Sequence, residues 1–155
     1  MEDFLKEQGI EYIMHEHAPV FTGEELEKLN IPGLAAKNLF LRDQKSTRFL
    51  LVILLATKKT DLKKLGETTG AGKLSFVNAE TLYAKLGVEP GSVSPFGLLN
   101  DTKSEVEVFI DHEIMNAPAV QFHPNRNTAT LVLTSEMFTR YLSLIRNKIS
   151  VMNNL

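Results

Sequence analysis

The sequence predicts an α/β fold in which strands and helices alternate along one chain. Two apolar runs, residues 39–41 and 49–55, flank a short polar segment and predict a β-hairpin at the centre of the fold. The second run is apolar throughout, which is typical of a central strand covered on both faces. Segments with helical spacing and capping residues lie before and after the hairpin. At 155 residues, the chain is expected to form a single domain over residues 1–155.

The composition excludes several classes of protein and of site. There are no cysteines, so disulfides, thiolate metal sites and a cysteine nucleophile are excluded. The net charge is −2, so a nucleic-acid partner would have to bind a local basic patch. The first six residues are partly acidic and no later apolar run reaches the ~18 residues of a membrane span. We therefore expect a cytoplasmic protein without a membrane partner.

Three elements are expected before the hairpin, and each follows from local residue chemistry. They are a helix over residues 2–8, a strand over 10–17 and a helix from Thr22 to Leu29. Gly9 can take the left-handed conformation that ends a helix. Thr22 and Glu25 have the spacing of a capping box, which predicts the start of the second helix.

The segment after the hairpin predicts further helices and strands. Thr60 or Asp61 can cap a helix with a basic outer face, and Asn78 can cap a helix that ends at Gly87. Two prolines and two glycines make residues 89–97 a loop. Strands are expected over residues 74–77, 98–100, 105–110, 119–122 and 128–133, with turns at 70–73 and 123–127. The longest helix is expected over residues 135–149, with Phe138, Tyr141, Leu142 and Ile145 on its buried side.

Lys37 lies where the first arm of the hairpin begins, among residues that should be buried. Its stem can run along apolar surface with the ammonium in water, which is the usual arrangement. Alternatively, the ammonium faces a cleft and holds a phosphate or a developing negative charge. The residues around it leave both interpretations open.

Other familiar site patterns are poorly supported. Residues 70–73, Gly-Ala-Gly-Lys, lack the spacing of a phosphate-binding loop and the following Ser or Thr. His15 and His17 lie two apart on a strand, with His112 or His123 as a third ligand, but such histidines are usually polar surface, and we expect no metal site. Ser92 and Ser94 do not lie in a nucleophile elbow.

Several longer motifs together carry a resemblance to a known family. They are Val20-Phe21-Thr22-x-x-Glu25, Lys37-Asn38-Leu39-Phe40-Leu41, Gly72-Lys73-Leu74-Ser75-Phe76, Gly91-Ser92-Val93-Ser94-Pro95-Phe96-Gly97-Leu98-Leu99-Asn100-Asp101 and Phe122-His123-Pro124-x-x-Asn127-Thr128-Ala129-Thr130. This combination, which spans nearly the whole chain, resembles the YbaK/ProX superfamily of aminoacyl-tRNA editing domains. It is most similar to the free-standing branch related to the editing insertion of bacterial prolyl-tRNA synthetase, often called PrdX or ProXp-ala.

The resemblance implies a mixed, partly barrel-like β-sheet with surrounding helices and a cofactor-free site that hydrolyses the ester of a mischarged tRNA. It makes Lys37, Gly97 and His123 the catalytic candidates. The implied substrate-binding residues are Thr22, Asn38, Phe40, Gly91, Ser94, Pro95, Asn127 and Thr128. In this family the 2′-hydroxyl of the substrate's terminal adenosine is thought to help activate the water. From the residues alone, an ordinary turn is the more common interpretation of the glycine loop and of His123. Asn127 and Thr128 likewise fit a turn and the start of a strand.

The resemblance further implies that the chain deacylates alanyl-tRNA(Pro) in trans. A synthetase pocket built for proline discriminates weakly against a smaller apolar amino acid, so a second site is needed to remove the product. Removal of cysteine or another small residue is the alternative within this class. A module of the same fold that binds tRNA or a synthetase without catalysis is the alternative outside it. Prolyl-tRNA synthetase and an elongation factor are candidate partners.

Five lysines are predicted to bind the tRNA acceptor end. They are Lys58, Lys59, Lys63, Lys64 and Lys73. A solvated helix face is the ordinary interpretation of such a run. A protein that acts on a tRNA end must nevertheless neutralise phosphates. If this patch is ordinary surface, Arg42, Arg48 or Arg126 would have to take its place.

Overall fold

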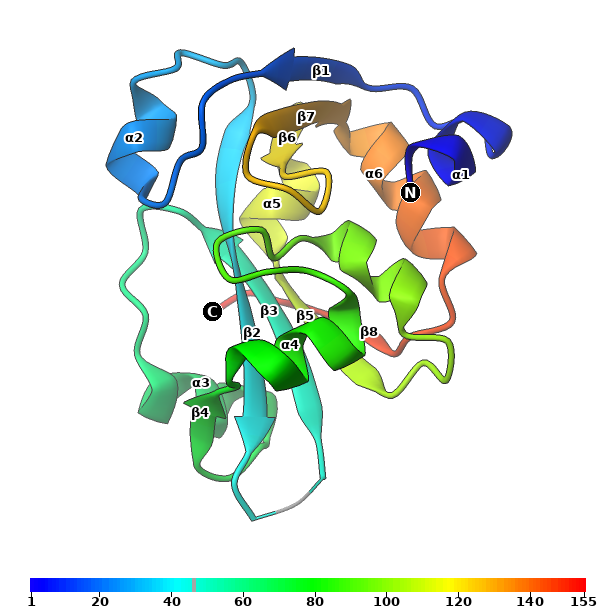
Figure 1. Cartoon of the computed structure of the whole chain (residues 1–155). Coiled ribbons are helices and arrows are strands. Elements are labelled where there is room, and N and C mark those ends of the chain that lie inside the picture. Colours follow the sequence, from blue (N-terminus) through cyan, green and yellow to red (C-terminus); the bar gives the residue numbers. More distant parts are fainter. Residues whose placement is uncertain (46) are drawn as a thin grey trace.

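The computed structural model describes residues 1–45 and 47–155, and Figure 1 shows its helices and strands in chain order. The helices are α1 (Glu2–Glu7), α2 (Gly23–Glu27), α3 (Leu62–Thr69), α4 (Ala79–Leu86), the 3-10 helix η1 (Pro95–Asn100), α5 (His112–Asn116) and α6 (Ser135–Leu144). The strands are β1 (Ile13–Glu16), β2 (Leu34–Asp43), β3 (Phe49–Leu55), β4 (Leu74–Phe76), β5 (Val106–Asp111), β6 (Ala119–Phe122), β7 (Ala129–Thr134) and β8 (Ile149–Met152). The predicted α/β class is confirmed.

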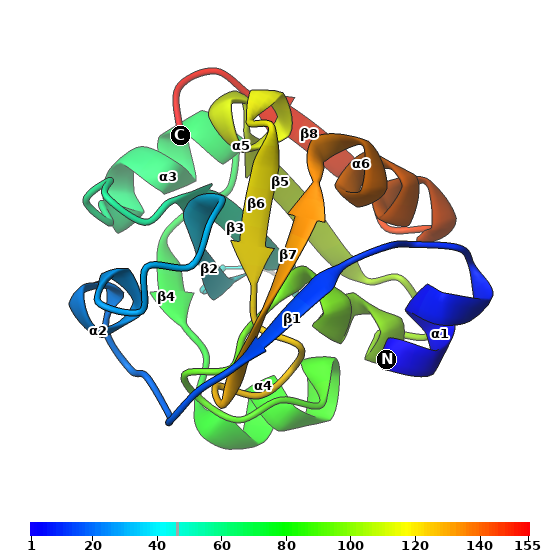
Figure 2. The same ribbon diagram turned by 90° about the horizontal axis from the view of Figure 1, so that it is seen from above.

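The strands form one eight-stranded mixed sheet in the order β1-β7-β6-β2-β3-β5-β8, and β4 pairs with β2. The β2–β6, β3–β5 and β5–β8 pairs are parallel, and the other pairs are antiparallel. Figure 2 shows β6, β7 and β1 side by side. Within the described residues the sheet is open, with β1 and β8 at its ends. The mixed topology agrees with the expected editing-domain architecture.

The central hairpin is confirmed, with β2 and β3 antiparallel over seven paired positions, residues 36–42 with 49–55. Residues 50–54 of β3 are all buried. Leu51 and Ile53 pack into a core shared with α1, α4, η1, α5 and α6. Leu50, Val52 and Leu54 pack on the opposite face, against Leu65 of α3 and other residues. Both faces of β3 are therefore covered, because helices lie on each side of the sheet.

The predicted caps fix the helix ends. The Thr22 hydroxyl accepts the amide of Glu25 at 3.1 Å and begins α2. Asp61, rather than Thr60, caps α3 by accepting the amide of Lys64 at 3.1 Å. Helix α4 begins after Asn78 and ends at Gly87, which has a φ of +67°. Among the helices of the described residues, none has the length and apolar character to cross a membrane.

One predicted strand and one predicted helix are wrong. Residues 98–100 belong to η1 rather than to a strand, because the Ser94 hydroxyl accepts the amide of Phe96 at 3.1 Å and Pro95 begins the turn. The predicted helix over 135–149 ends at Leu144, and Ile149 begins strand β8. The Asn147 side chain donates to the carbonyl of Val106 at 2.9 Å and thereby brings the chain back to β5.

The structure also contains one helix that was not predicted and one strand that is shorter than predicted. Helix α5 was not predicted; it begins where the Asp111 carboxylate accepts the amide of Glu113 at 3.0 Å. The strand expected over 10–17 is limited to β1, because the amide of Ile10 bonds to the carbonyl of Leu5 at 2.9 Å and holds the chain against α1. Both depend on contacts that apolar periodicity does not record.

Candidate active site

A cavity of about 260 Å³ lies between β2 and the loops around α2, Gly91 and His123. It brings together five of the predicted site residues, Thr22, Lys37, Asn38, Gly91 and His123. Its remaining walls are apolar and are formed by Val20, Phe21, Leu26, Ala36, Ala56 and Val93. Residues separated by about a hundred positions in sequence therefore meet in one small site.

Lys37 extends from β2 toward the loop after β3. Its ammonium donates a hydrogen bond to the backbone carbonyl of Lys58. Partial burial lowers the pKa of Lys37 from its ordinary value. An ammonium group has three N–H donors, so this bond leaves two of them. The structure thus places Lys37 at the cavity, with its direction set by a backbone group.

His123 is held in one tautomer. Its Nδ1 lies 3.1 Å from the carbonyl oxygen of Ala129, which can only accept, so Nδ1 carries the proton. Desolvation lowers the pKa of His123, the positive potential of His17 adds to this effect, and the Ala129 bond opposes it. The ring is therefore neutral at neutral pH. Its Nε2 then offers a lone pair to the cavity.

His17 lies beside this ring, with centroids 6.5 Å apart. Its Nδ1 is 2.8 Å from the carbonyl of Ala18, and its Nε2 is 2.8 Å from the hydroxyl of Thr130. Both ring nitrogens are therefore engaged by protein groups. In this arrangement neither His17 nitrogen is available as a metal ligand.

Asn38 has a buried side-chain oxygen. It lies on β2 next to Lys37, and its Oδ1 is buried without a hydrogen-bond partner among the residues that the structure describes. A buried amide oxygen without a partner is costly unless a ligand or water supplies a donor. Lys37, Asn38 and His123 are therefore the lining residues that could form charged or strongly polar contacts with a ligand.

Hydrogen bonds join the glycine loop to the turn after β6, and that turn to the segment before α2. The Ser94 hydroxyl donates to Oδ1 of Asn125 at 2.8 Å, linking the glycine loop to the turn after β6. The Asn127 side chain donates to the carbonyl of Val20 at 3.3 Å, and the amide of Val20 donates to the carbonyl of Asn127 at 3.3 Å. Ser94 and Asn127 therefore shape the walls rather than line the cavity.

Comparison with known proteins identifies the family of the chain. The family model described as "Aminoacyl-tRNA editing domain" matches residues 17–141. The chain belongs to this aminoacyl-tRNA editing family. The "Prolyl-tRNA editing protein ProX" of Acetoanaerobium sticklandii is 45% identical over 134 residues, covering 85% of this chain and 82% of that protein. The "Prolyl-tRNA synthetase associated domain-containing protein 1" of Danio rerio is 34% identical over 146 residues, covering 92% and 79%.

Solved structures show the same fold. One described as a proposed trans-editing enzyme for prolyl tRNA synthetase superposes with a TM-score of 0.71, covering 98% of this chain and 93% of that chain at 18% identity. The hypothetical protein APE2540 superposes with a TM-score of 0.73, covering 96% and 95% at 16% identity. The fold of the editing family is therefore shared far beyond detectable sequence similarity.

Four residues expected in the editing site lie elsewhere. Phe40 is 3% exposed and stacks on Phe49 with centroids 5.7 Å apart. The Pro95 carbonyl accepts the hydroxyl of Tyr141 at 2.6 Å. The Thr128 hydroxyl accepts from Arg126 at 2.7 Å. None of these groups is among the described residues that line the cavity.

Gly97 is the fourth residue and requires a correction. Its amide donates to the carbonyl of Ser94 at 3.1 Å within η1, so it is not free to bind an oxyanion. A β-carbon at this position would lie 3.2 Å from the Cβ and carbonyl oxygen of Leu86. The glycine is therefore needed because α4 and η1 pack closely there.

The five predicted tRNA-binding lysines divide into two groups. Lys58 is turned inward: its ammonium pairs with the fully buried carboxylate of Asp111 and donates to the carbonyl of Leu155 at 2.7 Å. The other four lysines are exposed, and we call them the basic segment; they are Lys59, Lys63, Lys64 and Lys73. Lys59 and Lys64 line a second hollow of about 430 Å³ beside α3.

The alternative arginines are partly engaged. Arg48 pairs with Glu107 at 2.7 Å, and Arg126 approaches Glu16 at 3.4 Å. The Arg42 guanidinium lies 5.8 Å from the centre of the Phe49 ring. The basic segment is therefore the more available cationic surface among these candidates.

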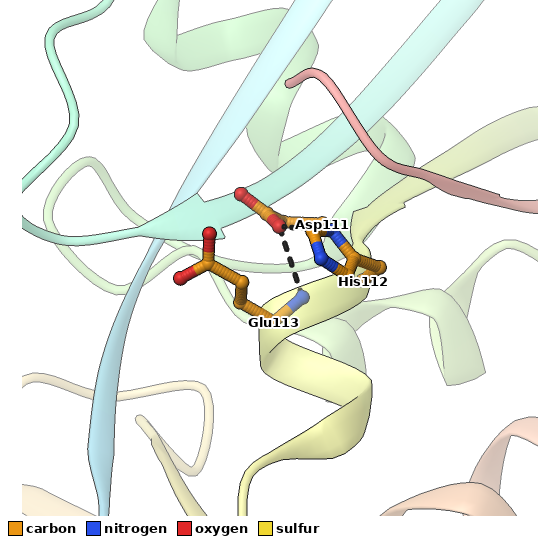
Figure 3. A group of neighbouring side chains, drawn as sticks. All are labelled: Asp111, His112 and Glu113. Atoms are coloured by element: carbon orange, nitrogen blue, oxygen red, sulfur yellow. Dashed lines mark hydrogen bonds and ion pairs between the residues drawn. The ribbon is translucent and has the colours of Figure 1, made fainter.

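Asp111, His112 and Glu113 form a polar cluster at the start of α5 (Figure 3). Their potential metal-ligand atoms lie within 4.8 Å of one another. One Asp111 oxygen caps α5, and the other pairs with Lys58, whose ammonium is also 3.9 Å from Glu113. The Lys58 ammonium thus lies beside two of these three side chains, Asp111 and Glu113. His15 and His17 do not join this cluster.

The structure adds site residues that the sequence did not single out. Phe21 forms the cavity mouth, Asn125 joins the two loops, and the Lys58 carbonyl orients Lys37. Phe21 did have a recognisable position, immediately before the helix cap Thr22. A large apolar residue there usually packs on the fourth helical residue, here Leu26, so its position predicts packing rather than function.

Proposed function

We propose that this chain is a trans-editing deacylase that hydrolyses alanyl-tRNA(Pro). The observation that carries the proposal is the cavity, which is lined by Lys37, Asn38 and His123 among small apolar side chains. An aminoacyl ester has the complementary groups, a carbonyl that accepts and an α-ammonium that donates. The 45% identical relative named a prolyl-tRNA editing protein supports this substrate class.

Lys37 is proposed to bind the ester carbonyl oxygen. As water attacks the carbonyl carbon, this oxygen gains negative charge, and a fixed ammonium stabilises it more than it stabilises the ground state. The hydrogen bond to the Lys58 carbonyl keeps the ammonium in place before the substrate arrives. Such preorganisation is what makes an electrostatic donor effective.

Asn38 and His123 are proposed to bind the α-ammonium. The amide oxygen of Asn38 and the unprotonated Nε2 of His123 can each accept one of its N–H groups. The low pKa of His123 favours this role, because the protonated ring would offer a donor and a like charge. The two acceptors and Lys37 together would fix the ester with its carbonyl open to water.

The proposed reaction requires no side-chain base. Among the described residues that line the cavity, none is a carboxylate and none is a serine. Water forms the new bond to the carbonyl carbon, the ester C–O bond breaks, and the proton of the water passes to the leaving ribose oxygen. The vicinal 2′-hydroxyl of the terminal adenosine is placed to relay that proton. Orientation and electrostatic stabilisation would supply the rate enhancement.

The walls suggest how the substrate is chosen. Val20, Ala36, Ala56 and Val93 leave a small apolar space, which suits the methyl group of alanine. A synthetase for proline discriminates against such a residue by only ~1–3 kcal/mol per missing methylene. A small second site can remove the smaller product. We place this activity in the cytoplasm, with prolyl-tRNA synthetase and an elongation factor as the proteins that would hold the same tRNA.

The test is deacylation of tRNA(Pro) charged with radiolabelled alanine, cysteine or proline. We expect rapid release of alanine and little release of proline. Faster release of cysteine would assign the alternative substrate. No release from any charged tRNA, together with retained tRNA binding in a filter assay, would favour the non-catalytic module.

A further inference from the structure

Phe21 is an exposed aromatic residue at the mouth of the cavity. It is 70% exposed, although it is a large apolar residue that directly precedes a helix. The ordinary role of this position is to pack on Leu26 at the start of α2. Most of the ring is not used for that packing. Its exposure therefore calls for another explanation.

The backbone around Phe21 is fixed on both sides. Val20 exchanges two hydrogen bonds with Asn127, one through its amide and one through its carbonyl. Thr22 caps α2 through the amide of Glu25. The exposed ring is thus held between two anchored residues. Little conformational entropy would be lost if a ligand packed on it.

Gly91 lies against the ring of Phe21. A β-carbon added at Gly91 would lie 3.3 Å from Cδ1 of Phe21, so the ring rests close to this backbone. Gly91 also has a φ of +88°, which side chains other than glycine rarely adopt. The glycine therefore allows the ring to lie at the rim without a competing side chain.

The cavity is small for a site that binds a nucleotide ester. Its volume of about 260 Å³ is below the ~300–1,000 Å³ of typical small-molecule sites. If the amino acid occupies the cavity, the ribose and base of the terminal nucleotide must lie at its mouth. Phe21 is the aromatic residue of that mouth among the lining residues described.

We propose that Phe21 is a stacking platform for the terminal adenine of the tRNA. This inference rests on the proposed function, because it takes the amino acid to lie in the cavity. Bases stack on aromatic side chains through their π-faces. Stacking would direct the ribose ester past Gly91 toward Lys37. The platform would thereby bind the part of the substrate that does not react.

The first test is kinetic. Replacement by leucine keeps apolar bulk but removes the aromatic face, so Phe21→Leu should raise the KM for alanyl-tRNA by ~5- to 150-fold with kcat little changed. Phe21→Trp should stay near the parent. Phe76→Leu is the matched control, because Phe76 is 57% exposed on β4 and lies outside the cavity. An unchanged KM in Phe21→Leu would overturn the proposal.

The second test does not depend on activity. The chain has no tryptophan, so Phe21→Trp introduces a single fluorophore at the mouth. Adenosine monophosphate should quench it saturably, whereas ribose 5-phosphate should not. Phe76→Trp should show no saturable change with either compound. Equal responses to both compounds, or no response, would overturn base stacking. Saturable quenching without any deacylation would instead retain the adenine site and reject the proposed reaction.

Discussion

The cavity and the basic segment both contain lysines, but the ammonium groups are bonded to protein atoms at the cavity and exposed to solvent on the basic segment. At the cavity, Lys37 is bonded to a backbone carbonyl, and the neighbouring Lys58 is paired with a buried carboxylate. On the basic segment, Lys63 and Lys64 lie on the exposed side of α3. A lysine fixed by the fold can act on one atom of a substrate. A lysine on a solvated face acts through general attraction to phosphate, which salt screens.

Lys58 joins these two regions. Its side chain binds Asp111 and the carbonyl of Leu155, while its own carbonyl accepts from Lys37. Its position in the sequence, beside Lys59, indicates surface charge. Its contacts indicate a structural role that supports the orientation of Lys37. The comparison therefore predicts that neighbouring lysines will respond very differently to substitution.

The largest expected effect is on stability, in Lys58→Met. Loss of the ammonium leaves the fully buried carboxylate of Asp111 without its counter-charge, which should cost ~3–5 kcal/mol of unfolding free energy. Urea denaturation of the variant measures this directly. Lys59→Met is the matched control and should be nearly neutral. In the double variant Lys58→Met with Asp111→Asn, much of the stability should return. Equal stability of the two single variants would refute the structural role of Lys58.

The next effect is on catalysis, in Lys37→Ala. If the ammonium stabilises the developing oxyanion, its removal should reduce kcat by about 100- to 1,000-fold. The thermal midpoint should change little, because Lys37 is not part of either apolar core. Single-turnover deacylation measures the loss, and Lys103→Ala, at an exposed lysine outside the proposed sites, provides the control. A variant that melts normally and keeps its activity would remove Lys37 from the mechanism.

A smaller effect is expected from pH through His123. Its pKa is lowered from the ordinary value of 6.5, so the ring should stay neutral at pH values where a free histidine is already protonated. The value of kcat/KM should therefore remain level as pH falls through 6.5. Below the lowered pKa it should fall about tenfold per pH unit. In His123→Gln, this fall in kcat/KM at low pH should disappear. A decline that starts above pH 6.5 would contradict the neutral acceptor role.

The lowered pKa of His123 also determines how the stability of the fold changes with pH. Because the folded pKa is below the unfolded one, the unfolded chain binds a proton more readily as pH falls. The contribution of neutral His123 to stability is therefore complete above the unfolded pKa. It declines as pH decreases toward the folded pKa. Denaturation at several pH values, with His123→Gln as reference, measures this difference.

The basic segment should give a modest, salt-dependent effect. Replacing Lys63 and Lys64 together by alanine should raise the KM and lower the slope of log K against log salt by ~0.9 per lost duplex phosphate contact. Turnover at saturating tRNA should be unchanged. The double variant Lys6→Ala with Lys103→Ala carries the same change in charge on other exposed residues. Identical slopes for the two double variants would show that tRNA docks elsewhere.

The smallest effect is expected from chelators. Both nitrogens of His17 are bonded to protein groups, and the acidic cluster at the start of α5 already holds the ammonium of Lys58. Deacylation should therefore be the same before and after treatment with EDTA. A reproducible loss, restored by one divalent metal, would reverse this expectation.

The sequence by itself determined the elements whose causes are local. The apolar run 49–55 requires cover on both faces, and Asn78 and Gly87 fix both ends of α4, because these effects depend on neighbours in the chain. The motifs around Lys37 and His123 likewise identified the family, and both residues line one cavity. Such information is carried by residue type and spacing, and it needs no long-range contact.

Only the tertiary structure decided which of the chosen residues share the cavity. Gly97 has its amide committed to η1, Phe40 is buried, and Lys58 is turned toward Asp111, although their sequence contexts suggested otherwise. Strand β8 likewise forms where β5 offers an edge, although Ile149 fitted the helical pattern. The physical reason is that side-chain direction, desolvation and pairing depend on groups brought together from distant parts of the chain. Apolar periodicity records which residues prefer burial, but it does not record which groups they meet there.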